Sequence, residues 1–177
     1  MRNEVIFMFF YTGIPVMMAA AAVVMDLRTA RVDNGWILFC MAAGLAMRIL
    51  ANGIIGVFWY FTGALIPVVL LGWLFVFRML GPGDIKLLSV IGGILGAGEI
   101  VKCILGAMFI GAAISAALLI SNGNICQRFL YLWSYICQTA RTGKRKPYYQ
   151  KGMLPLENFH FTVPVFLSVL LYAGGVY

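Results

Sequence analysis

Long apolar runs fill most of this chain and leave little room for a water-soluble fold. Val5 to Met25 contains no charged residue, and about twenty such residues cross the hydrocarbon core of a bilayer as a helix. Of the 177 residues, 63% are apolar and only 11% are charged, which excludes an ordinary soluble globule. The sequence therefore predicts an all-α, polytopic membrane protein.

Six apolar segments are candidates for transmembrane helices: Val5–Met25, Gly35–Ala51, Ile54–Phe77, Leu87–Gly98, Ile100–Ile120 and Phe159–Tyr177. The fourth has only about a dozen residues, too few for a relaxed span, so we expect it to begin on unwound backbone or to borrow length from residues before Gly81. The small residues at Ala19–Ala22 resemble a cleavage site, so a cleaved signal peptide is the alternative interpretation of the first segment. The apolar run of this segment is, however, longer than that of a usual signal peptide.

The region between the last two spans, Ser121–Asn158, carries two further signals. Apolar residues recur at helical spacing in Ile125–Cys137, which predicts an interfacial amphipathic helix. Arg141–Lys146 is a basic cluster that we interpret as an anchor on anionic lipid headgroups, with docking of a substrate or partner as the alternative. No repeat or linker separates a second domain, so residues 1–177 are expected to form a single membrane-embedded domain.

The basic residues determine the expected orientation. Placing both termini outside puts ten of the 13 Lys and Arg at the cytoplasmic ends of the spans and leaves Arg2, Arg48 and Lys102 outside. Such an excess is typical of cytoplasmic loops. The surplus of seven positive charges then faces anionic lipid, and nucleic acid is not an expected partner.

Few residues are available for metal or histidine chemistry. His160 is the only histidine, and Cys40, Cys103, Cys126 and Cys137 are widely spaced. Zinc hydrolases and Ser-His or Cys-His mechanisms need imidazoles as ligands or bases, and paired cysteines are needed for a disulfide framework or a zinc knuckle. We therefore expect no metal, no cofactor and reduced cysteines, and we interpret His160 as structural.

Two aspartates stand at the cytoplasmic ends of apolar segments in this orientation. Asp26 follows the first span and Asp84 opens the fourth, so both carboxyls are expected at one membrane depth. Two close carboxyls in a low-dielectric site share a proton. Such a pair can activate water and polarise a carbonyl, as aspartic proteases do. The alternatives are that Asp84 caps its helix and that Asp26 is an ordinary interfacial residue.

The residues before Asp84 suit a substrate-binding loop. Gly81 and Gly83 give backbone freedom and allow close approach, and Pro82 forbids a regular helix through the turn. A substrate strand could therefore lie beside the carboxylate.

Three polar residues near the two aspartates complete the candidate site. Lys86 lies two residues after Asp84, so on a helix it points away from that carboxylate and reaches headgroups or the substrate. Arg28 is expected to meet lipid phosphate or a neighbouring carboxylate. Asn34 is expected to cap the second helix.

These residues also match two motifs of a known family. Gly-Pro-Gly-Asp-Ile-Lys at residues 81–86 resembles the G-x-G-D-x-K motif of the type IV prepilin peptidases, which are membrane aspartic proteases. Residues 26–34 resemble the family's D-x-R-x-x-x-I-P-N stretch, with Asp33 in place of the proline. The segment from His160 to Pro164 is loosely similar to the family's proline-containing entry into its last helix.

The resemblance implies a function. It implies a peptidase of the prokaryotic cytoplasmic membrane that removes the leader from prepilin or pilin-like precursors at the cytoplasmic face, with Asp26 and Asp84 as catalytic pair. The chain resembles short members that lack the methyltransferase region, so no S-adenosylmethionine dependence is expected. A small transporter or proton channel and a noncatalytic membrane scaffold remain the alternatives, and no feature of the sequence indicates an oligomeric state.

Overall fold

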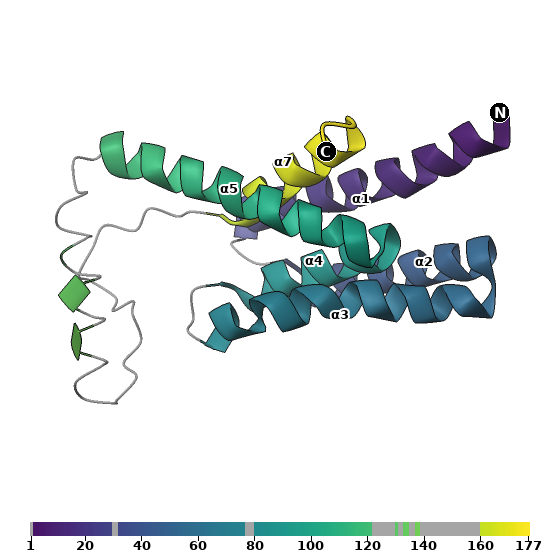
Figure 1. Ribbon diagram of the computed structural model, residues 1–177, viewed down its shortest axis with the longest axis horizontal. Helices are drawn as coiled ribbons and strands as arrows, with labels where there is room; N and C mark the ends of the chain where they lie inside the picture. Colours follow the sequence, from purple (N-terminus) through teal and green to yellow (C-terminus); the bar gives the residue numbers. More distant parts are fainter. Residues whose placement is uncertain are drawn as a thin grey trace. The chain divides into compact units, whose positions relative to one another are not determined.

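The computed structural model describes residues 2–29, 32–76, 80–121, 130, 133–134, 137–138 and 160–177. Its regular elements there are helices: α1 (Arg2–Thr29), α2 (Asn34–Asn52), α3 (Ile54–Val76), α4 (Pro82–Leu95), α5 (Ala97–Ser121) and α7 (Thr162–Ala173) (Figure 1). Segments of α1, α2, α3 and α5 are long and apolar enough to cross a membrane. The predicted all-helical, polytopic membrane fold is confirmed.

Four of the six expected spans correspond to long apolar helices among the described residues, the expected short fourth helix is present, and the sixth is shorter than expected. α4 has 14 residues and α7 has 12, whereas the sixth span was expected over Phe159–Tyr177. At 1.5 Å per residue, α4 is about 21 Å long, less than the roughly 30 Å of a hydrocarbon core. A helix this short is compatible with a membrane protein because protein rather than lipid surrounds it. Seven residues of α4 are buried: Leu87, Leu88, Val90, Ile91, Gly92, Gly93 and Ile94.

The chain divides into two compact units, Met1–Ile110 with His160–Tyr177 and Gly111–Phe159. The helix packing and the candidate site described below lie in the first unit. The expectation of a single membrane domain stays a prediction. The Arg141–Lys146 cluster lies outside the described residues, as does most of the expected interfacial helix. Cys40, Cys103 and Cys137 are free thiols, as expected.

Within the first unit, α4 packs on α1, α2 and α3 and contributes to two apolar clusters. Leu87, Leu88 and Ile91 pack with Ala22 of α1 and Val165 of α7. On its other side, α4 packs with residues of α2 and α3: Val90 and Ile94 share a cluster with Ile37, Cys40 and Tyr60. The helix that carries Asp84 is therefore the centre of the unit.

A glycine contact brings α3 and α4 together at short range. A β-carbon on Gly63 would lie 2.1 Å from the Gly92 carbonyl oxygen, and one on Gly92 would lie 2.4 Å from the Gly63 carbonyl oxygen. Only glycine permits this approach of two backbones, as in other membrane helix pairs with small residues at the contact. Gly92 therefore serves helix packing.

The C-terminal end of α4 is held by an arginine. Gly96 ends the helix with φ of 99°, a conformation that favours glycine. Arg48 of α2 donates from Nε to the Gly93 carbonyl at 3.2 Å and stacks over the Tyr11 ring at 5.1 Å. The Arg48 side chain thus turns inward onto a helix end whose carbonyls need donors.

Candidate active site

Asp26 lies in the last turn of α1, which continues to Thr29, beyond the expected end of the first span. Its Oδ2 accepts a hydrogen bond from Thr162 Oγ1 at 2.7 Å and lies 3.0 Å from His160 Nδ1. The Asp26 side chain is 14% exposed and that of His160 is 20% exposed. The first candidate carboxylate is thus partly buried between α1 and the start of α7.

The structure therefore places His160 against Asp26, a contact that its interpretation as a structural residue did not anticipate, and Thr162 was not recognised from the sequence at all. Both residues lie more than 130 positions from Asp26 along the chain. Helical periodicity relates only residues one or two turns apart, so it carries no signal for this contact. The one available signal was the loose likeness of the His160–Pro164 segment to the family's entry into its last helix.

Asp84 lies in the first turn of α4, which begins differently from what we expected. Gly81 is the N-cap residue and Pro82 takes the first helical position, where its missing N–H and fixed φ cost nothing. Gly83 and Asp84 are already helical, so the expected unwound start is wrong. Asp84 is not the N-cap either: its carboxyl accepts a hydrogen bond from the Gly81 backbone N–H, as the third residue of a capping box does.

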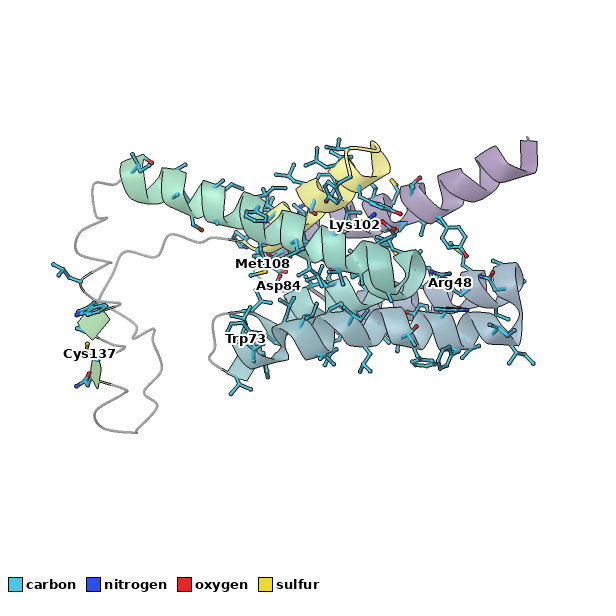
Figure 2. All side chains as sticks on the ribbon, viewed as in Figure 1. Arg48, Trp73, Asp84, Lys102, Met108 and Cys137 are labelled. Carbon is cyan, nitrogen blue, oxygen red and sulfur yellow. The ribbon has the colours of Figure 1, made fainter. Side chains whose placement is uncertain are left out.

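The two carboxyls interact electrostatically. Asp84 precedes the apolar run of α4 and lies outside the four candidate spans. Burial raises the pKa of Asp84 to about 6, and the nearby Asp26 carboxylate acts in the same direction, while the Gly81 N–H and His160 oppose the rise. Figure 2 shows Asp84 well away from Arg48. The prediction that Asp26 and Asp84 meet at one end of the helices agrees with this coupling.

The remaining polar residues of the expected site are placed as follows. Lys86 donates from Nζ to Asn34 Oδ1 at 3.0 Å, so it joins α4 to α2. Asn34 does not cap α2, because Asp33 is the N-cap residue. Arg28 is exposed in the last turn of α1, where a cation suits the helix dipole.

This arrangement can perform acid-base chemistry. With a pKa of about 6, the Asp84 carboxyl is protonated in about half of the molecules at pH 6 and about a tenth at pH 7. The Asp26 carboxyl beside it has two hydrogen-bond partners. One group can then accept a proton while the other donates one. Among the described residues, no group of three His, Cys, Asp or Glu side chains is placed to hold a metal ion.

Comparison with known families identifies the chain. A model of the type IV leader peptidase family matches residues 13–116, a range that includes both Asp26 and Asp84. Comparisons with curated proteins and with solved structures found no match. The family match spans more than half of the chain and agrees with the motifs at residues 26–34 and 81–86. The chain therefore belongs to the type IV leader peptidase family.

Proposed function

We propose that this protein is a membrane aspartic endopeptidase that removes the leader peptide from type IV prepilins or pilin-like precursors. The observation that carries the proposal is that Asp26 and Asp84, 58 positions apart in sequence, lie close enough for the Asp26 charge to contribute to the raised pKa of Asp84. Such coupling is the basis of aspartic-protease chemistry. The peptidase family of the chain supports the same reaction class.

The reaction needs only the two aspartates and water. The ionised carboxylate takes a proton from water as the water oxygen attacks the scissile carbonyl carbon, and the protonated carboxyl gives its proton to the carbonyl oxygen. In the second step, the first carboxyl passes its proton to the leaving amine, the C–N bond breaks, and the second carboxylate recovers a proton from the gem-diol. Both groups return to their starting states.

The proposed substrate is a prepilin whose apolar helix lies in the membrane beside the leader. We place the site at the cytoplasmic face of a prokaryotic cytoplasmic membrane, with both termini outside, because ten of the 13 basic residues then lie at the cytoplasmic ends. Anionic lipids are the expected surroundings of that face. No cofactor is required by this reaction.

Co-expression with a prepilin substrate tests the proposal. Wild-type protein should yield the shortened pilin, and Asp26→Asn and Asp84→Asn should each lower processing by about 10³-fold or more, since general acid-base catalysis of this kind contributes roughly 10²–10⁴-fold. Asparagine preserves the shape of each side chain and removes the proton exchange.

Asp33→Asn is the matched control. It makes the same chemical change at an exposed residue near the same helix ends, and Asp33 makes no side-chain cap bond to α2. Normal processing is expected for it. Full processing by either catalytic-pair variant would contradict the proposal, as would ion flux through the wild-type protein without any cleavage, which is the behaviour of a transporter.

A further inference from the structure

Asp26 and Asp84 have different surroundings. Thr162 and His160 both approach a single oxygen of Asp26, Oδ2, at 2.7 and 3.0 Å. Among the described residues, no contact of this kind ends on Asp26 Oδ1. Asp84 instead accepts a backbone N–H at the start of its own helix. The two carboxyls of the proposed pair are therefore not equivalent.

The two residues that approach Asp26 are well placed to hold it. Thr162 is 1% exposed and begins α7, so its hydroxyl is fixed by the helix. His160 lies two residues earlier, and its Nδ1 must carry the proton to donate to a carboxylate. Neither residue lies within the residues 13–116 that the family model matches, so the family match assigns them no role.

We propose that His160 and Thr162 are positioning residues that keep Asp26 ionised and oriented, so that Asp26 Oδ1 takes the proton of the attacking water and Asp84 is the acid. This assignment rests on the proposed function above. Donors on Oδ2 stabilise the negative charge of Asp26 in a partly buried place, and they leave the other oxygen for water. Asp84, whose pKa is raised to about 6, is the group that retains a proton.

Among the described residues, two carboxyls interact with His160. Asp26 faces it from α1 at 3.0 Å, and Asp84 interacts with it electrostatically from α4. Lys86 of α4 donates to Asn34, and Arg28 of α1 is exposed. His160 therefore acts on both carboxyls, whereas the hydroxyl of Thr162 donates to Asp26. Because of this difference, substitutions of the two residues should change the pH profile of kcat in different ways.

Two pairs of variants in the full-length protein test the assignment, with kcat and KM measured on a prepilin in membranes. Thr162→Val removes the hydroxyl at nearly constant volume and should lower kcat about tenfold or more, the fold-change for one lost hydrogen bond to a charged group. Thr162→Ser should retain kcat within about threefold.

His160→Phe should also lower kcat about tenfold or more, and His160→Asn, which keeps a donor near the Nδ1 position, should recover most of it. KM should stay within about twofold in all four, because neither residue touches substrate.

The pH profile separates positioning from a merely structural role. Thr162→Val should move the acidic limb of kcat upward, because the carboxylate loses one hydrogen-bond donor, and should leave the alkaline limb in place. His160→Phe should move both limbs upward, since His160 lowers the pKa of Asp84 in the native protein. A loss of folded protein would scale the profile without moving a limb.

The outcomes distinguish this assignment from the proposed function. Suppose that the wild-type protein cleaves and that both Asp→Asn variants fail. If Thr162→Val and His160→Phe then keep the wild-type kcat and both limbs of its pH profile, the assignment is overturned and the peptidase function stands. Loss of activity in step with loss of folded protein, with unmoved limbs, overturns the assignment too. Absence of cleavage by the wild type would instead contradict the proposed function itself. Ser168→Ala, which removes a buried hydroxyl of α7 that donates to the Cys103 carbonyl, is the control for destabilising the same helix and should move neither limb.

Discussion

The two ends of α4 are built in different ways. Near its N-terminal end, polar side chains are joined by side-chain hydrogen bonds: Lys86 donates to Asn34 of α2, and Thr162 and His160 contact Asp26 of α1. Toward its C-terminal end, α4 lies against the α3 backbone at Gly63 and Gly92, and Arg48 donates to its carbonyl at Gly93.

This difference separates the rigid part of the fold from the adjustable part. A backbone contact between two glycines admits no added atom, because neither helix can move without losing its neighbours. A side-chain hydrogen bond can be rebuilt by another donor of similar reach. We therefore expect substitutions near the C-terminal end of α4 to change mainly stability, and substitutions at the N-terminal end to change mainly catalysis.

The largest effect on stability is expected for Gly63→Ala. Its β-carbon would lie 2.1 Å from the Gly92 carbonyl oxygen, so the helices must separate, at a cost of about 3 kcal/mol in the free energy of unfolding. Gly72→Ala is the control in the same helix, because no atom lies within 4 Å of its added β-carbon, and a change of less than about 1 kcal/mol is expected. Unfolding in detergent micelles measures both, and equal stability of the two variants would contradict the rigid contact.

A smaller loss of stability is expected for Arg48→Met. The variant keeps an apolar stem but removes the donor to Gly93 and the cation over Tyr11, which together contribute about 2 kcal/mol. Lys102→Met serves for comparison, since Lys102 pairs with Glu99 at 3.0 Å while 52% exposed, and such pairs contribute less than about 1 kcal/mol. If the Lys102 variant unfolded as early as the Arg48 variant, the inward role of Arg48 would be wrong.

The pH dependence of cleavage tests the N-terminal end of α4, where Asp84 lies. Asp84 has a pKa raised to about 6, and as the proposed acid it must be protonated, so kcat/KM should fall about tenfold per pH unit above that value. Folding stability should change with the same sign: a raised folded-state pKa stabilises the fold at low pH, and this contribution is lost as pH rises through about 6. Activity that is constant or rising from about pH 6 to pH 8 would exclude Asp84 as the acid.

The smallest effect is expected for the link between Lys86 and Asn34. Both residues are exposed, so breaking their 3.0 Å hydrogen bond should cost about 0.5 kcal/mol of stability. A double-mutant cycle of Lys86→Met and Asn34→Ala measures the coupling between them. A coupling near zero would show that this contact does not hold α2 to α4.

The bounds of α2 and α3 could be predicted closely because they depend on local composition. The predicted span Gly35–Ala51 lies one residue inside each end of α2 (Asn34–Asn52), and Ile54–Phe77 exceeds α3 (Ile54–Val76) by one residue. The start of α4 was mispredicted because Pro82 was taken as a helix breaker, whereas a proline at the first helical position loses no hydrogen bond.

The amino-acid sequence by itself determined that the chain is a helical membrane protein, with Asp26 after one apolar segment and Asp84 before another. It could do so because span length and charge are properties of contiguous residues. It also carried the family motifs around those aspartates. Only the tertiary structure decided that His160 and Thr162 lie on Asp26, that Lys86 reaches Asn34, and that Gly63 meets Gly92. These contacts join different helices, and which helix faces meet depends on how all the side chains pack at once rather than on any local pattern.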